Sequence, residues 1–61
     1  MNLKFEYKNW QGKVAIREVQ PISLWFGFTE FHKETQWFLK AYDVNKQAGR
    51  DFALKDIIKF M

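Results

Sequence analysis

The stretch from Thr35 to Asp43, Thr-Gln-Trp-Phe-Leu-Lys-Ala-Tyr-Asp, constrains the fold of this chain most. Successive side chains of a β-strand point to opposite faces, so the alternation in this stretch predicts a central strand. One predicted face is apolar throughout and is assigned to the core: Trp37, Leu39 and Ala41. The other mixes two aromatic rings with a cation, and we expect it to be half exposed and able to meet a partner: Phe38, Lys40 and Tyr42.

Similar alternation elsewhere predicts four further strands, at residues 3–8, 13–20, 22–28 and 50–54. Pro21 cannot donate a ladder hydrogen bond and is expected to mark a corner or an edge between two of them. Residues 9–12 predict a hairpin loop. Trp10 at its tip could be a binding ring, but we expect it to fold back over its own hairpin as a lid. Residues 27–34 are expected to form a loop, and the apolar stripe of residues 54–61 predicts one or two helical turns capping the sheet.

Five short strands at regular spacing indicate an all-β fold, a small antiparallel barrel with a short C-terminal helical turn. A bulge is expected in the second strand, turning both Ile16 and Val19 inward. The predicted core takes its members from all five strands and from the terminal turn: Phe5, Tyr7, Val14, Ile16, Leu24, Trp37, Leu39, Phe52, Leu54 and Ile57.

The 61 residues allow one domain, spanning 1–61, with a marginal core that a 20% aromatic content helps to stabilise. The chain has no Cys, which excludes disulfides and thiolate zinc sites and is compatible with a reducing compartment, so a cytoplasmic location is expected. It contains no apolar run of membrane-spanning length, and no membrane partner is expected. A net charge of +3 indicates either a mild bias toward anionic partners or an ordinary surface of mixed charge.

The chain offers no recognisable catalytic constellation. It has one Ser (Ser23), one His (His32) and three Gly that form no phosphate-binding loop. Ser23 lies on a predicted strand rather than on the turn that exposes a nucleophile. His32 has no second ligand at metal spacing and is expected to be a solvated loop residue. We therefore expect no catalysis, no metal site and no cofactor.

Two arginines suggest a recognition surface instead. Arg17 lies on a predicted strand among apolar residues, and Arg50 begins the last strand directly after a Gly. Guanidinium groups near the rings of Phe38, Tyr42 and Trp25 could hold a phosphate while bases stack on those rings. The alternative is two surface ion pairs of little energetic consequence. In that case Arg17 would pair with Glu18 or Glu6, and Arg50 with Asp43 or Asp51.

Four pieces of sequence, in order along the chain, resemble the WYL domain of bacterial regulators. They are an aromatic on the first strand, an Arg four residues before a Pro, a Trp-aromatic-Leu triplet with an aromatic soon after it, and Arg-x-Phe-x-Leu before an Ile. In this chain they read as Tyr7, Arg17 with Pro21, Trp37-Phe38-Leu39 with Tyr42, and Arg50-Asp51-Phe52-Ala53-Leu54 with Ile57. The resemblance spans about fifty residues, nearly the whole chain, and differs from the family triplet at its middle residue, where Phe38 lacks a hydroxyl.

The resemblance implies an Sm-like, SH3-type barrel that acts as a ligand-sensing regulatory module. Family members are linked to transcription control, DNA-damage responses and phage defence in bacteria and phages, and several bind nucleic acid or nucleotide-like anions. A module without the family's usual helix-turn-helix neighbour is expected to act through a partner or through self-association. Carried over by position, the ligand residues would be Tyr7, Arg17, Phe38 and Arg50, with Lys40 and Tyr42 beside them.

Two functions remain open from the sequence. The first is a binding module for single-stranded nucleic acid or a nucleotide-like anion. The second is a protein-interaction or homo-oligomerisation module, in which exposed aromatic side chains pack against a second copy or a regulatory protein. Trp25, Phe26, Phe28 and Phe31 are numerous for so small a surface and support the second function.

Overall fold

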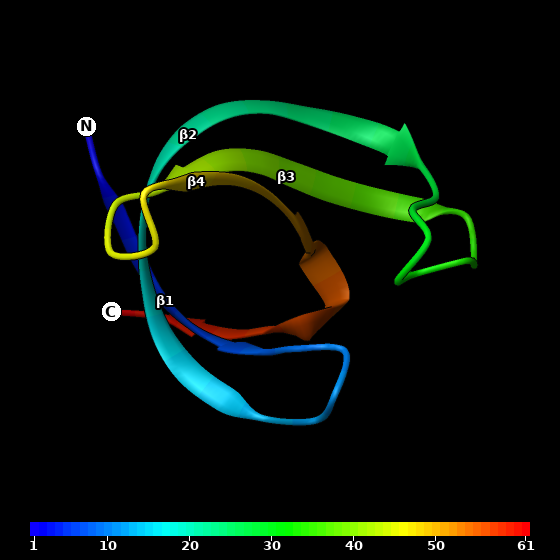
Figure 1. Ribbon diagram of the computed structural model, residues 1–61, viewed down its shortest axis with the longest axis horizontal. Helices are drawn as coiled ribbons and strands as arrows, with labels where there is room; N and C mark the ends of the chain where they lie inside the picture. The colour runs from blue at the N-terminus through cyan, green and yellow to red at the C-terminus, as the bar shows by residue number, and fades with distance from the viewer.

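The longest element of the computed structural model, which describes residues 1–61, is the 14-residue strand β2 (Val14–Gly27). A straight strand of that length would extend roughly 45 Å at about 3.3 Å per residue. The longest dimension of the molecule is only 27 Å, so β2 has to bend. Figure 1 shows β2 as a long arc. Its pairing with β3 is irregular between Pro21 and Ser23, where Ile22 is left out of the register.

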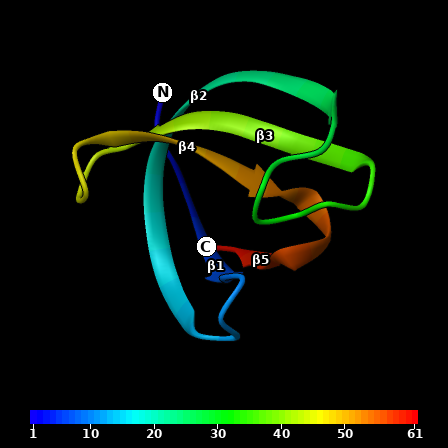
Figure 2. The ribbon, with the colours of Figure 1, turned by 45° about the vertical axis from the view of Figure 1, so that its right-hand side comes forward.

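The remaining elements are shorter. They are β1 (Leu3–Lys8), β3 (Gln36–Asp43), β4 (Ala48–Ala53), the 3-10 turn η1 (Leu54–Asp56) and β5 (Ile57–Phe60). All neighbouring strands are antiparallel, in the order β4-β3-β2-β1-β5, and no ladder joins the edge strands β4 and β5. Figure 2 shows the same sheet with β5 beside β1. The sheet is therefore strongly bent but open.

Strand β2 belongs to two hairpins at once. Its first half pairs with β1 and its second half pairs with β3. Val19 lies where the two ladders meet, opposite Leu3 on one side and Asp43 on the other. The Val19 side chain is fully buried, which fits a β-branched residue at the centre of a sheet.

The core lies between strands that are not neighbours in the sheet. The Phe52 ring in β4 makes edge-to-face contacts with Phe5 and Tyr7 in β1, at centroid distances of 5.3 and 4.9 Å. The Ala53 N–H in β4 also donates a hydrogen bond to the Tyr7 hydroxyl, 2.9 Å away and buried. Aromatic packing and this one bond thus connect β1 to β4, which share no ladder. Six buried side chains form the core cluster: Phe5, Tyr7, Val19, Leu39, Ala41 and Phe52.

The predicted element boundaries were wrong at two places. The segments 13–20 and 22–28, expected as separate strands, form one strand, because the bulge beside Pro21 absorbs the bend without ending the ladder. The predicted C-terminal helical turns are a single 3-10 turn followed by β5, because β1 has a free edge on which β5 pairs. The structure contains no helix with the length and apolar character needed to span a membrane. The five-stranded, antiparallel, mainly β fold is confirmed, whereas closure into a barrel is not.

The predicted core was partly right. Phe5, Tyr7, Leu39 and Phe52 are buried, and Ile57 packs against them half-buried. Five predicted core residues are instead exposed: Val14, Ile16, Leu24, Trp37 and Leu54.

Trp37 is exposed and Phe38 is buried, the reverse of the prediction, and the reversal has a local cause. Trp37 lies next to the last pair of the β2–β3 ladder, beyond the core, and is 53% exposed. Phe38, expected on the half-exposed face, is fully buried. The Trp25 ring stacks on it at 4.7 Å, and the His32 ring meets it edge-on at 5.9 Å. Trp25 of β2 and His32 of the β2–β3 loop thus cover a face of β3 that the alternation alone assigns to solvent.

Replacing Tyr7 with Phe tests the connection between β1 and β4. The change leaves the ring in place and removes the acceptor of the buried Ala53 N–H, so we expect a loss of about 1–3 kcal/mol in the free energy of unfolding. Urea denaturation of Tyr7→Phe measures the loss. Tyr42→Phe is the matched control, because Tyr42 is exposed. Equal stability of the two variants would contradict the proposed connection.

Candidate functional site

A cleft of about 520 Å³ lies where three connecting segments meet the strands. The β1–β2 loop contributes Trp10, the β2–β3 loop contributes Phe31 and His32, and the β3–β4 turn contributes Lys46. The strands contribute Tyr7, Arg17, Gly49, Arg50, Asp51 and Phe52. The cleft therefore combines aromatic rings, cations and a phenolic hydroxyl.

Three of the six residues predicted as ligand-binding line this cleft: Tyr7, Arg17 and Arg50. They come from β1, β2 and β4, so the fold brings them together although they are far apart in sequence. The other three, all from β3, do not line it: Phe38, Lys40 and Tyr42. Phe38 is fully buried, so its ring offers no free face for a base. Lys40 and Tyr42 are exposed outside the cleft.

Arg17 is held by a partner that neither sequence alternative named. Its Nη1 donates to Asp43 Oδ2 at 2.9 Å, and its guanidinium carbon lies 5.8 Å from the centre of the Phe52 ring. The expected pairs with Glu18 or Glu6 do not form; the Glu18 carboxylate accepts a bond from Asn2 instead. The guanidinium has five N–H donors and Asp43 takes one of them, so others remain for a ligand.

Asp43 also organises the β3–β4 turn. Its side chain is 1% exposed, and its Oδ1 accepts the backbone N–H groups of Asn45 at 3.0 Å and Lys46 at 3.1 Å. Burial alone would raise the pKa of the Asp43 carboxyl. The backbone donors of the turn and the Arg17 guanidinium outweigh burial and hold that pKa below its ordinary value of 3.8. One ionised carboxylate thus positions two cationic residues of the cleft, Arg17 and Lys46.

Arg50 and Lys46 have no carboxylate within ion-pair distance. The alternative pairing of Arg50 with Asp43 or Asp51 is therefore wrong. Asp43 is taken by Arg17, and the Asp51 carboxylate accepts the indole N–H of Trp25 at 2.9 Å. Asp51 and Glu30 also line the cleft, so its two cations without an ion pair, Arg50 and Lys46, are matched in number by two carboxylates.

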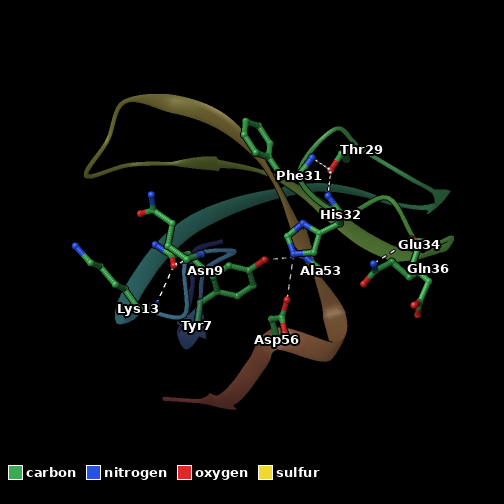
Figure 3. A network of polar contacts seen from close by, with 11 residues as sticks. Tyr7, Asn9, Lys13, Thr29, Phe31, His32, Glu34, Gln36, Ala53 and Asp56 are labelled. Carbon is green, nitrogen blue, oxygen red and sulfur yellow. Dashed lines mark hydrogen bonds and ion pairs between the residues drawn. The ribbon is translucent and has the colours of Figure 1, made fainter.

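His32 is half-buried, not the solvated loop residue that we expected. Its ring nitrogen Nε2 lies 3.2 Å from Asp56 Oδ2, so the β2–β3 loop is tied to the η1 turn. Its backbone N–H donates to the Thr29 hydroxyl at 3.0 Å. Figure 3 shows these contacts next to the bond between Tyr7 and Ala53. No group of three or more His, Cys, Asp or Glu side chains is arranged to hold a metal ion.

The Tyr7 hydroxyl is a neutral hydrogen-bond donor at the wall of the cleft. Burial raises the pKa of Tyr7 above its ordinary value of 10.0, although the Ala53 N–H that it accepts acts in the opposite direction. The phenol therefore keeps its proton at neutral pH. Since the bond from Ala53 uses an oxygen lone pair, the hydroxyl hydrogen remains available to donate.

Three residues of the cleft were not among the predicted ligand-binding residues, and they lie in three different connections: Trp10, Phe31 and Lys46. Trp10 lies at the hairpin tip, but it packs on Phe31 of the next loop instead of covering its own hairpin. The available signal was a large aromatic ring in each of two otherwise polar loops. Lys46 carried no signal, since a lysine in a polar turn is ordinary.

The family comparison identifies the kind of module that carries this cleft. A sequence model of the WYL domain matches residues 1–60. The chain belongs to the WYL domain family. WYL domains are in general regulatory modules of the ligand-sensing type. Comparisons with curated proteins and with solved structures gave no match. In this WYL domain the family triplet is Trp37-Phe38-Leu39. Trp37 is exposed, and Leu39 is buried.

The role of Asp43 predicts how the free energy of unfolding falls at acid pH. A depressed folded-state pKa contributes stability that is fully present above the unfolded-state value, about 3.9, and is lost as the pH falls through the folded value. Asp43→Asn should therefore be less stable than the wild type by about 1–3 kcal/mol at pH 7, and this difference should shrink below about pH 4. Urea denaturation between pH 7 and pH 2 measures it.

Glu34→Gln serves as the control, because Glu34 is exposed and forms no ion pair. Its free energy of unfolding should fall at acid pH as that of the wild type does. A constant difference between wild type and Asp43→Asn across the whole pH range would show that the Asp43 charge does not stabilise the fold.

Proposed function

We propose that this WYL domain senses a nucleoside phosphate, either a free nucleotide or a single-stranded nucleic acid, in the cleft between its loops, and that it does so without catalysis. The observation that carries the proposal is the pair of unpartnered cations, Arg50 and Lys46, beside aromatic rings and free hydrogen-bond donors. In this proposal the occupied cleft is the signal, and the process served is transcription control or phage defence.

The cations favour an anionic ligand. Arg50 forms no internal ion pair, so its planar guanidinium can bind two phosphate oxygens without first breaking an ion pair. Lys46 adds a second charge from the turn that Asp43 holds. The two carboxylates of the cleft, Glu30 and Asp51, repel a phosphate in part. We therefore expect weak binding that falls steeply with salt.

The neutral donors favour a ligand richer in acceptors than a simple ion. Arg17 keeps unused N–H groups, and Tyr7 keeps its hydroxyl hydrogen. Both positions are fixed by buried contacts, so little side-chain entropy is lost when they bind. The cleft volume of about 520 Å³ also lies within the usual range for small-ligand sites, about 300–1,000 Å³.

The Arg50→Ala variant tests the phosphate contact. Arg50 is exposed and makes no internal ion pair, so the variant should fold like the wild type. We expect its affinity for a short labelled oligonucleotide to fall about tenfold at low salt, which is the value of one charged hydrogen bond. The slope of log affinity against log salt should become less steep by about 0.7. Fluorescence anisotropy measures both.

Lys40→Ala is the matched control, since it removes the same charge from β3 outside the cleft. It should bind almost like the wild type. A parallel titration with a mononucleotide distinguishes the two ligand sources, because only a strand occupies further phosphate contacts. If the wild type binds neither ligand at low salt, the proposed function is wrong.

We propose self-association as a second function, on a separate observation. Phe26 and Trp37 lie opposite each other at the end of the β2–β3 ladder with ring centroids 5.3 Å apart, and both are more than half exposed. Leu24, two residues before Phe26, is also more than half exposed and lies on the same face. An exposed apolar patch of this kind usually marks an interface. The patch has no charge of its own to complement a charged partner, so we expect a second copy across a two-fold axis.

Phe26→Gln tests this association. The wild type should form a dimer at micromolar concentration in sedimentation velocity, and Phe26→Gln should remain monomeric because it places an amide at the centre of the patch. Phe28→Gln is the control, since Phe28 is also more than half exposed but lies outside the ladder. A wild type that stays monomeric at high concentration would exclude the dimer.

A further inference from the structure

Two aromatic rings from different loops stack on each other at the cleft. Trp10 lies in the β1–β2 loop and Phe31 in the β2–β3 loop, with ring centroids 5.5 Å apart and planes inclined by 30°. Both side chains line the cleft, yet Trp10 is 60% exposed and Phe31 is 58% exposed. The pair thus leaves much ring surface in water, next to the cations Arg50 and Lys46.

The loop that carries Trp10 is fixed by its own hydrogen bonds. The side-chain oxygen of Asn9 accepts the backbone N–H groups of Gln11 and Lys13, both at 2.9 Å. Gly12 provides the positive φ of 83° that the turn requires, a conformation in which other residues are strained. Trp10 is therefore presented from a rigid hairpin tip.

The loop that carries Phe31 is fixed in a similar way. The Thr29 hydroxyl accepts the backbone N–H groups of Phe31 at 3.2 Å and His32 at 3.0 Å, as Figure 3 shows. The bond from His32 to Asp56 then anchors the loop to the η1 turn. The backbones of both loops are thus held by hydrogen bonds before any ligand arrives, and the two rings contact each other, which lowers the entropy cost of stacking against them.

We propose that the Trp10–Phe31 pair is the platform on which the base of the ligand stacks, while Arg50 and Lys46 hold its phosphate. This inference rests on the proposed function and gives it a specific subsite. The rings already touch, so a base stacks on an outer ring face and does not enter between them. Every base has an aromatic face, and the platform therefore selects for the presence of a base with little preference among bases.

The platform replaces the one that the sequence predicts. Phe38 is fully buried beneath Trp25, and Tyr42 lies outside the cleft, so neither ring can stack with a base while the phosphate contacts Arg50. Among the aromatic residues lining the cleft, Tyr7 and Phe52 are buried, whereas Trp10 and Phe31 are exposed. Exposure and position thus assign the stacking role to the loop pair.

A comparison of two ligands tests the platform. One is a short end-labelled single-stranded oligonucleotide, and the other is an abasic strand of the same length and phosphate count. The wild type should bind the normal strand about 5- to 150-fold more tightly than the abasic strand, the range expected for one stacked base. Trp10→Leu should lose most of that difference and leave the abasic affinity unchanged. Leucine keeps apolar bulk against Phe31 but has no aromatic face.

Phe31→Leu provides a second variant, and Phe28→Leu provides the control, because Phe28 is an exposed aromatic residue outside the cleft. Thermal melts by circular dichroism confirm that each variant is folded. Equal binding of the two strands by the wild type, or an equal loss for both strands in the two loop variants, overturns the platform alone. If the wild type binds neither strand at low salt, the proposed function fails and the platform fails with it.

Discussion

The buried carboxylate of Asp43 is the contact on which both the fold and the cleft depend. It accepts one bond from Arg17 in β2 and two from the backbone of the β3–β4 turn. The N–H of Val44, the next residue, donates to the Glu18 carbonyl at 3.0 Å and ties the same turn to β2. A charge this deeply buried is tolerable only because a cation and oriented N–H groups replace the water it loses. Asp43 also lies opposite Val19, the residue at which the two ladders of β2 meet.

The open sheet makes such side-chain connections more important than in a larger protein. No ladder joins β4 to β5, so the two arms of the sheet are connected by side chains and by the chain itself. The rings of Phe5, Tyr7 and Phe52 fill the space between them, and the bond from Ala53 to Tyr7 satisfies an edge-strand N–H that would otherwise lie buried without a partner. A domain of 61 residues has little reserve of buried area. These few contacts therefore determine whether β1 and β4 stay together, and with them the walls of the cleft.

Alternation along the chain predicted strand structure for β1 to β4 but not for β5, because a period-two pattern is present wherever one face of a strand is buried. It did not predict which face of β3 is buried near the end of the β2–β3 ladder. Trp37 lies past the edge of the core and is exposed, whereas Phe38 is covered by Trp25 and His32. Of the predicted ligand residues that line the cleft, Arg17 and Arg50 were singled out as cations on predicted strands, whereas Tyr7 came from the family resemblance.

Other parts of the structure could not be read from one sequence. The partner of Arg17 is 26 residues away, beyond any local rule. The apolar stripe of residues 54–61 fitted a helix by spacing, but its outcome was decided by the free edge of β1, which is not a local property. In the cleft itself, Tyr7, Arg17 and Phe52 sit on core strands, whereas Trp10, Phe31 and Lys46 sit on three separate connections. Changes at Tyr7, Arg17 or Phe52 therefore alter stability and binding together, whereas changes on the connections can alter the ligand without disturbing the core. Such a division suits a sensing module, because one fold can then be adapted to different ligands through its loops.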